Sequence, residues 1–489
     1  MNRAFEFIPG LLSWSTLALV VLLSWQKPVW IAIFIILFDL YWLLKSVYLS
    51  LHLRSSFNRM KANLAVSWRE KLAIFSRWQD IRHLVILPMA SEPYEVVRET
   101  FESLRKCNYP KDKIILVLAI EERMGEPAKA VAEKIKKEFS GYFPHFAVTC
   151  HPADLPDEIP GKGSNETWAA KEIKRLVIDP LKIPYENIIV SVFDVDTQVF
   201  PEYFGCLTYN FLTAEKPQRS SFQPIPLFTN NIYRAPALAR VISFSASFWQ
   251  MMQQSRPERL TTFSSHAMPF KVLTEIGYWQ KNIVSEDSRI FWQCYFHYNG
   301  DWRVVPLFFP VSMDANSAPS FWKTMVNLYK QQRRWAWGAE NIPYMLSGFW
   351  KNKTMLLHTK AYWSFNAVEG FHSWSTNSII IFALGWLPVL IGGHGFNQSV
   401  LSYNLPGITR SIMLLASIGI ASSAVLSVAL LPPRPEGFRL RHYAWYILQW
   451  ALMPLTLIVF GAIPALEAQT RLMLGGKFRL GFWITPKGR

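Results

Sequence analysis

The sequence predicts an α/β domain with a mainly parallel sheet, helices on both of its faces, and transmembrane and amphipathic interface helices flanking it. Apolar runs of about 20 residues lie toward both ends of the chain, and this is the length that a membrane-spanning helix requires. Between them, short apolar runs alternate with segments of helical periodicity, as in parallel sheets covered on both faces. A basic amphipathic segment, 320–338, follows this alternating region.

Composition and charge limit the partners. The 489 residues include 15% aromatic residues, and such a chain must bury apolar surface in lipid as well as in a core. The net charge is +16, but the basic residues lie beside the hydrophobic runs. This placement fits the positive-inside rule and anionic lipid, so we expect membrane lipids and no nucleic acid as partners. Four cysteines without CxxC spacing indicate a reduced, cytosolic setting with no disulfide framework or zinc site.

The first fifty residues, 1–50, are expected to form two transmembrane helices, at 8–25 and 29–49. A cleaved signal peptide is the competing interpretation of the first run. A second span follows at once, however, and no small-x-small cleavage site is present. The basic stretch from 45 to 77 then places the following domain, 51–319, in the cytosol of a plasma-membrane protein.

Within 51–319, strand and helix patterns alternate. Ligands of parallel α/β sheets bind beyond the carboxyl ends of the strands. Four acidic residues stand at such ends and become candidates for a site: Glu121, Glu122, Asp194 and Asp196. We expect strands at 83–90, 113–120, 146–151 and 187–193, and helices at 92–107, 127–139 and 165–178.

The C-terminal part divides into interface helices, 320–372, a membrane region, 373–468, and a basic tail, 469–489. The loop 431–442 is rich in arginine and should be cytosolic, whereas 392–407 has no lysine or arginine and should be external. Three crossings would leave the basic tail outside. Either the last apolar segment is re-entrant, or a half-span before 375 is missed. The candidate spans are 375–391, 408–431 and 443–465.

Two acidic motifs could carry chemistry. Asp194 and Asp196 are two residues apart, so they would point the same way if the strand continued, and they would suit Mg²⁺ or Mn²⁺. On its own, a solvated strand-to-helix turn explains them better. Ser285-Glu286-Asp287 precedes an aromatic-rich helix, and it fits a helix N-cap with acidic first-turn residues. A carboxylate held there could also act as a general base.

A third motif lies in the amphipathic segment. Gln331, Arg334 and Trp335 share one face of a helix because they are three and four residues apart. The segment is explained equally well by attachment to anionic lipid or by presentation of an amide, a guanidinium and an indole to a partner.

The three motifs in this order, between N-terminal and C-terminal spans, resemble the membrane-integrated family 2 glycosyltransferases, of which cellulose synthase and hyaluronan synthase are the best-known members. The resemblance implies a GT-A-like fold and a nucleotide-sugar donor, expected to be UDP-linked. It assigns Asp194 to the nucleotide-sugar, Asp196 to the metal and Asp287 to the general base. It also implies that the diphosphate and the acceptor end are held by Gln331, Arg334 and Trp335, with Glu286 on the acceptor side.

Three matches to this family are looser. Glu121 and Glu122 stand where the family usually has an aspartate that contacts the nucleobase. Lys162, in Gly161-Lys162-Gly163-Ser164-Asn165, is either a phosphate contact or a solvated lysine in a glycine turn. His266 lies in the region of an acceptor-side loop, and a structural histidine explains it equally well.

The tail contains Phe482-Trp483-Ile484-Thr485-Pro486-Lys487, which resembles the FxVTxK gating loop of cellulose synthases. The resemblance implies that Thr485 and Lys487 reach toward the bound nucleotide. The alternative is a plain basic cytosolic tail.

These observations favour an inverting, processive synthase that extends a glycan from a nucleotide-sugar and passes it through its own membrane helices. Inversion follows from direct displacement with a single positioned base. The alternative is a non-processive transferase that glycosylates a membrane lipid. A non-catalytic membrane scaffold is a third possibility, which the intact acidic motifs disfavour.

Overall fold

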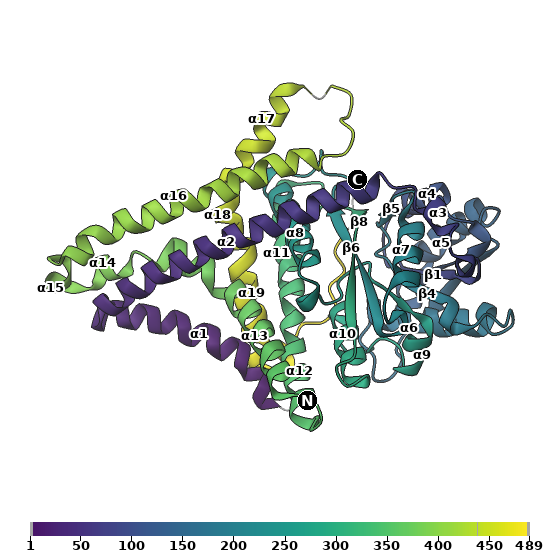
Figure 1. The fold of residues 1–489 in the computed structure, drawn as a ribbon, viewed down its shortest axis with the longest axis horizontal. Helices are drawn as coiled ribbons and strands as arrows, with labels where there is room; N and C mark the ends of the chain where they lie inside the picture. Colours follow the sequence, from purple (N-terminus) through teal and green to yellow (C-terminus); the bar gives the residue numbers. More distant parts are fainter. Residues whose placement is uncertain (1–2, 438, 487–489) are drawn as a thin grey trace. The chain divides into compact units, whose positions relative to one another are not determined.

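The computed structural model describes residues 3–437 and 439–486. The chain divides into two compact units (Figure 1). The sheet unit comprises Ser55–Pro236, Ser243–Asn327 and the chain from Gly481 on. The helical unit comprises the chain up to Arg54, Ala237–Ile242 and Leu328–Leu480.

An eight-stranded sheet forms the centre of the sheet unit, in the order β3-β2-β1-β4-β7-β6-β8-β5. Its first four strands are mutually parallel, and each contains one of the predicted apolar runs. The α/β fold class is therefore confirmed. These strands are β1 Arg82–Pro88, β2 Ile114–Glu121, β3 His145–His151 and β4 Ile188–Val192.

The second half of the sheet was not anticipated from the sequence. β6 and β8 pair in parallel, whereas β7 pairs antiparallel with β4 and β6, and β5 pairs antiparallel with β8. Each of β6 and β8 contains two prolines, which remove ladder donors and normally indicate a loop or an edge strand. A register shift between Gln223 and Ile225 accommodates them. The strands are β5 Gln198–Val199, β6 Ser220–Phe228, β7 Ala267–Pro269 and β8 Arg303–Met313.

The predicted helices of this region form within a few residues of their expected bounds. α4 spans Tyr94–Lys106, α5 spans Gly125–Phe139, and α6 spans Lys162–Ile173 and continues as a π-helical turn. The acidic triplet Ser285-Glu286-Asp287 opens α10, Glu286–His297. The remaining helices are α3 Trp68–Leu72, α7 Tyr203–Thr213, α8 Ala237–Gln254 and α9 Phe270–Glu275.

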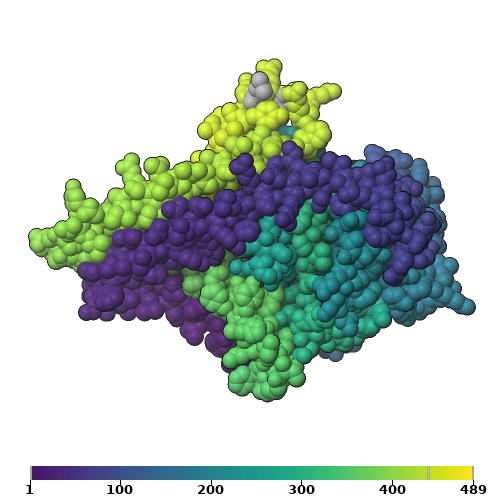
Figure 2. Space-filling view, viewed as in Figure 1, coloured from purple at the N-terminus to yellow at the C-terminus, as the bar shows by residue number. Residues whose placement is uncertain are grey.

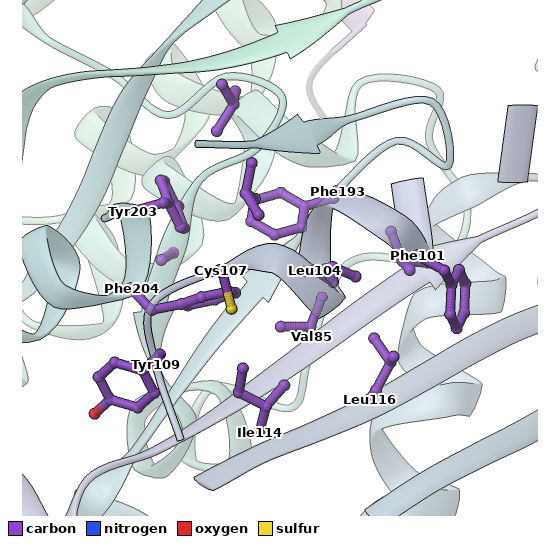
Figure 3. Close-up of a cluster of buried hydrophobic side chains, with 14 of the residues drawn as sticks. Val85, Phe101, Leu104, Cys107, Tyr109, Ile114, Leu116, Phe193, Tyr203 and Phe204 are labelled. Carbon is purple, nitrogen blue, oxygen red and sulfur yellow. The ribbon is translucent and has the colours of Figure 1, made fainter. Parts of the chain in front are cut away.

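One hydrophobic cluster fixes the strands and helices against each other (Figure 3). Val85 of β1 and Leu116 of β2 are fully buried beneath Phe101 and Leu104 of α4. Burial of each large apolar side chain contributes roughly 2 kcal/mol. The loops at the carboxyl ends of the strands therefore start from a rigid base. The cluster also includes Cys107, Tyr109, Ile114, Phe193, Tyr203 and Phe204.

Four described helices of the chain are long and apolar enough to cross a membrane: α1 Arg3–Gln26, α2 Pro28–Leu64, α16 Val400–Ala429 and the stretch Arg441–Leu474. The last consists of α17 Leu440–Leu448, α18 Met453–Thr456, α19 Ile463–Leu474 and the 3₁₀ and π turns between them. Along α16, apolar side chains such as Leu414, Ile418 and Val425 are exposed, and the surface of this helix is yellow-green in Figure 2. Such a surface is stable against lipid tails and not against water.

The predicted span 375–391 is not among these four helices, because α13 Leu357–Ile379 is too polar and α14 Leu387–Ile391 is separate. The segment 369–391 nevertheless contacts α2 along its length and runs in the opposite direction to it. Lys45 pairs with Glu369, and a Cβ at Gly392 would lie 2.8 Å from Pro28 Cβ. α16 then runs back, since Phe396 and Leu405 pack on Ala32, while Gly419 lies beside Ser50.

The stretch Arg441–Leu474 begins and ends at the same side of the helical unit. Trp450 donates a hydrogen bond to Ser427 at the end of α16, over 3.0 Å. At its other end, the carbonyl oxygen of Leu472 accepts one from Arg3 at the start of α1, over 3.0 Å. If α1, α2, 369–391 and α16 alternate in direction, the start of α1 and the end of α16 lie on the same side of the helical unit. Hydropathy alone marks this stretch as a span, but these contacts favour a helix that lies along one side.

A buried polar network joins α1, α13 and α19. Ser13 donates to Gln469 over 2.8 Å and lies 2.8 Å from the hydroxyl of Ser375, and all three side chains are fully buried. Gln469 also donates to the carbonyl oxygen of Phe371 over 2.8 Å. Hydrogen bonds of this kind hold membrane helices together, because apolar contacts alone give little advantage over lipid.

The amphipathic segment is the helix α11, Phe321–Ala336, followed by a 3₁₀ turn and α12, Asn341–Lys351. Its C-terminal half belongs to the helical unit, where Arg333 and Tyr329 both bind Glu467 of α19, over 2.6 and 2.7 Å.

Candidate active site

Asp194 lies just beyond the carboxyl end of β4 and is held by two polar side chains. Its Oδ1 pairs with Lys162 Nζ over 2.9 Å, and its Oδ2 accepts a hydrogen bond from Ser264 over 3.1 Å. The side chain keeps 29% of its surface exposed. It is therefore the accessible member of the DxD pair.

Asp196 occupies a different environment. It is fully buried, and its Oδ2 accepts the backbone N–H of Asp314 over 3.0 Å. Asn230 donates both to the carbonyl oxygen of Asp196 and to Asp314 Oδ1, over 2.9 and 3.1 Å. The expectation that both aspartates point the same way required a continuing strand, but β4 ends at Val192. The loop therefore gives each carboxylate its own surroundings.

The two carboxylates fit a divalent metal that arrives with a phosphate ligand. Among the described residues, no group of three or more histidine, cysteine or acidic side chains could hold a metal ion. Mg²⁺ commonly uses one or two carboxylates and completes its shell with water and substrate phosphates. Asp196, held in place by the backbone of Asp314, and the accessible Asp194 meet this lower requirement.

Lys162 is the cationic centre of this region. It opens α6 and keeps only 10% of its side chain exposed, with Glu166 at 3.5 Å and Glu286 at 3.8 Å in addition to Asp194. Burial lowers the pKa of Lys162, but the surrounding carboxylates outweigh burial and raise the pKa well above its ordinary value. The ammonium is thus charged at neutral pH, which the predicted phosphate contact requires.

The start of α10 approaches the start of α6 closely. A Cβ at Gly163 would lie 3.0 Å from Glu286 Cβ, so any side chain there would have to displace its neighbours. Glu286 is buried, whereas Asp287 is partly exposed and accepts the N–H of Ser288 over 2.8 Å. The two first-turn acids are thereby separated into an inner and an outer carboxylate.

The acidic pair at the end of β2, Glu121 and Glu122, forms hydrogen bonds with other groups of the protein. Glu121 is buried and accepts two hydrogen bonds from the guanidinium of Arg123, over 2.7 and 3.0 Å. Glu122 is exposed and accepts the N–H of Ala153 over 3.0 Å. The predicted contact of this pair with a nucleobase remains a prediction.

His266 is buried, and its Nδ1 lies 3.1 Å from the carbonyl oxygen of Phe263. Burial, together with the charge of Lys162, lowers the pKa of His266 to about 3, so its ring is neutral. This placement matches a structural histidine well, and the acceptor-side role remains a prediction.

The tail segment that resembles a gating loop packs on the glycine turn before α6. A Cβ at Gly161 would lie 2.6 Å from Phe482 Cγ, so the phenyl ring lies against the glycine backbone. Thr485 is 7% exposed. Lys487 lies outside the described residues.

Gln331, Arg334 and Trp335 belong to the helical unit. Gln331 is buried, and Arg334 and Trp335 are partly buried, on the helix that Glu467 fixes through Arg333. Their predicted roles toward donor and acceptor remain predictions.

Several residues of the site escaped the sequence analysis. Glu166 lies on the predicted helix 165–178, but Lys162 was expected in the glycine turn before that helix, so their spacing of four residues on one helix became visible only because α6 begins at Lys162. Ser264, Asn230 and Asp314 come from three loops that are far apart in the sequence. No local pattern marks them, since only the fold brings them to Asp194 and Asp196.

Fold and site together define an α/β protein with a cluster of carboxylates and one lysine at the carboxyl ends of its parallel strands. The sequence matches the profile of the glycosyl transferase family group 2 over residues 189–466, more than half of its length. The chain belongs to this family and is a family 2 glycosyltransferase.

Two solved structures show a general likeness. One is the mannosyltransferase PcManGT from Pyrobaculum calidifontis in complex with GDP-Man and Mn²⁺, with 13% identity, a TM-score of 0.39, and coverage of 83% of this chain and 99% of that one. The other is S. aureus TarS 1-349 in complex with UDP-GlcNAc, with 13% identity, a TM-score of 0.38, and coverage of 72% and 93%. A search of curated proteins found no match.

Proposed function

We propose that this protein is an inverting, processive glycosyltransferase that extends a polysaccharide from a nucleotide-sugar and translocates it through its membrane helices. The observation that carries the proposal is the grouping of Asp194, Lys162 and Glu286 at the carboxyl ends of the sheet, next in sequence to the partly exposed Asp287. The order of the DxD, acidic triplet and QxxRW motifs supports it.

Asp287 acts as the general base. It takes the proton of the acceptor hydroxyl while that oxygen bonds to the anomeric carbon and the bond from this carbon to the diphosphate breaks. The electron pair leaves with the nucleoside diphosphate. One displacement of this kind inverts the anomeric centre.

Lys162 offsets the negative charge that develops on the leaving diphosphate, because its buried ammonium is held charged. A Mg²⁺ or Mn²⁺ ion, held by Asp196 with Asp194 beside the nucleotide-sugar, would supply further stabilisation of this charge. We assign Glu121 and Glu122 to contact with the nucleobase. Thr485 and Lys487 are assigned to contact with the nucleotide once the tail has closed over it. His266 and Glu286 are assigned to the acceptor side.

The QxxRW residues complete the proposal through the family resemblance. Arg334 and Gln331 contact the diphosphate, and Trp335 offers a flat face on which the acceptor sugar stacks. The sugar identity and linkage are left open by these residues.

We further propose a plasma-membrane protein with both termini and the sheet unit in the cytosol. Crossings by α1, α2, 369–391 and α16 put the arginine-rich loop 431–442 and the basic tail on the same side as the basic stretch 45–77, as the positive-inside rule requires. The contacts of Trp450 and Leu472 support this arrangement.

Product size tests the function. Purified protein in lipid is given labelled nucleotide-sugars with Mg²⁺, with Mn²⁺ or with a chelator, and the product is sized before and after lipid extraction. We expect a metal-dependent, long product that stays in the aqueous phase. A short product that extracts wholly into solvent would contradict polymer synthesis.

Transfer to a membrane lipid is the second candidate, and one feature favours it. An apolar groove of about 730 Å³ lies between α1 and the segment 379–391, where a lipid chain could lie. Trp14 and Trp25 are among its lining residues. The same extraction step distinguishes this candidate from the first.

A further inference from the structure

One buried acid of the site has no part in the mechanism above. Glu166 lies on α6, one turn after Lys162, and only 1% of it is exposed. Lys162 Nζ is 3.5 Å from its Oε1. Within the part of the chain that the structure describes, this oxygen makes no hydrogen bond.

The groups facing Glu166 are mostly anionic. Lys162 lies on its own helix, Asp194 lies beyond β4, and Glu286 and Asp287 open α10. From β3, His151 packs against Trp168 of the same helix and is itself paired with Glu158, over 2.9 Å. Four carboxyl groups, those of Glu166, Asp194, Glu286 and Asp287, therefore lie around the ammonium of Lys162. Each ionised carboxylate in this buried region raises the free-energy cost of ionising the next one, because like charges repel strongly out of water.

Of these acids, Glu166 is the one best suited to carry a proton. It is the most buried, and Gly163 brings Glu286 next to the same turn of helix, with 3.0 Å from a Cβ at Gly163 to Glu286 Cβ. An ionised oxygen without a hydrogen bond would be strongly disfavoured there. Burial raises the pKa of Glu166, Lys162 lowers it, and Glu286, Asp194 and Asp287 raise it further, so that the pKa lies well above its ordinary value.

We propose that Glu166 is a positioning residue that holds Lys162 at Asp194 and the donor diphosphate, and that it does so as a neutral, proton-bearing carboxyl group. The proposal deepens the proposed function and rests on it, since Lys162 is there the diphosphate contact. A neutral carboxyl group packs against the aliphatic part of the Lys162 side chain. It does not compete with Asp194 and the donor diphosphate for the ammonium group.

The consequence is an alkaline limit on donor binding. When Glu166 loses its proton, it competes for Lys162 and adds negative charge near the diphosphate. The donor KM of the wild type should then rise at least about tenfold, before kcat falls. Glu166→Gln keeps the shape and the neutrality, so its donor KM should match the wild type at neutral pH and stay flat at alkaline pH.

The experiment measures donor KM and kcat from neutral to alkaline pH for the full-length protein in lipid. Glu166→Leu, which cannot support the lysine, should raise KM at every pH. Glu172→Gln makes the same change on the same helix at an acid paired with Arg175 on the surface, and it should behave as the wild type. The infrared carbonyl band of a protonated carboxylic acid should be present in the wild type at neutral pH and absent in Glu166→Gln.

Three results would overturn the proposal: a raised KM or a failure to fold in Glu166→Gln, an alkaline rise of KM that persists in that variant, or no infrared difference between the two proteins. The infrared band does not depend on sugar transfer. If no nucleotide-sugar is turned over, the proposed function fails, and the band still decides whether Glu166 carries a proton.

Discussion

At the scale of single residues, chemically similar carboxylates of the candidate site lie in different environments. Asp194 is accessible and paired with Lys162, Asp196 is buried against the backbone of Asp314, and Asp287 keeps an exposed edge. Because each carboxylate has a different environment, each can have a different task although all are chemically alike.

Asp287→Asn should lower kcat by at least about 100-fold, the usual contribution of a general base. Donor affinity should change little, because an amide oxygen can still accept the N–H of Ser288. Transfer rate and nucleotide binding, measured separately by product counting and calorimetry, check this. Loss of nucleotide binding would remove Asp287 from the role of base.

Lys162→Met should destabilise the protein by about 3–5 kcal/mol at neutral pH, because it removes the buried cation that faces the carboxylates of Asp194 and Glu286. The pKa of Lys162 is raised by folding, so its contribution to stability is present at neutral pH and is lost only at strongly alkaline pH. In the variant the stranded carboxyl groups take up protons more readily, and the deficit should shrink as pH falls.

Thermal unfolding in detergent across the acidic and neutral range measures this deficit. Lys174→Met is the matched control, since Lys174 pairs with Asp179 at the surface and should be worth at most about 1 kcal/mol. Equal losses in the two variants at neutral pH would argue against the central place of Lys162.

At the scale of elements, two segments are held to the rest of their units by contacts that the sequence does not predict. The tail packs on the glycine turn before α6, and α19 is bound into the helical unit through Gln469. Each attachment can be broken by one substitution.

Gly161→Ala should displace the tail, because the new Cβ would lie 2.6 Å from Phe482 Cγ. If the tail is a gate required for turnover, this variant and a chain shortened after Leu480 should lose kcat alike, and combining them should add nothing. Initial rates at saturating donor measure the effect. Full turnover by the shortened chain would exclude a gating role.

Gln469→Leu should destabilise the helical unit by about 1–3 kcal/mol, since Ser13 and Ser375 would lose their partner in a buried place. Thr470→Val is the control on the next residue, because it removes the hydrogen bond from Trp14, whereas Gln469→Leu removes the hydrogen bonds to both Ser13 and Phe371. The midpoint of thermal unfolding in detergent compares the two. A control that loses as much as Gln469→Leu would show that the network has no special weight.

At the scale of the whole molecule, hydropathy and the contacts within the helical unit favour different membrane crossings before the tail. Hydropathy favours Arg441–Leu474 as a span and passes over 369–391, whereas contacts along α2 favour the reverse. Polar residues in 369–391 have partners within the unit, such as Thr16 for His372 over 2.9 Å, so composition alone understates its ability to cross.

Cysteine labelling tests this topology. In a Cys150→Ser background, which removes the exposed native thiol, Gln398→Cys should react with an impermeant maleimide in intact cells. Glu436→Cys should react only after permeabilisation. Labelling of Glu436→Cys from outside would mean that the Arg441–Leu474 stretch crosses the membrane.

The sequence by itself determined the fold class, the four parallel strands, the long apolar helices and the position of the motifs. These follow from local periodicity and from side-chain chemistry, which act within a few turns of chain. The sequence did not predict β6 and β8, because prolines are typical of loops and edge strands. In the structure, a register shift between Gln223 and Ile225 accommodates these prolines.

Only the tertiary structure decided which groups meet. Ser264, Asn230, Asp314 and Glu166 join the site through chain reversals that no local pattern encodes. The direction of the last helix was likewise decided by hydrogen bonds to α1 and α16. The physical reason is the same in both cases: burial and pairing depend on neighbours in space, and those neighbours are distant in sequence.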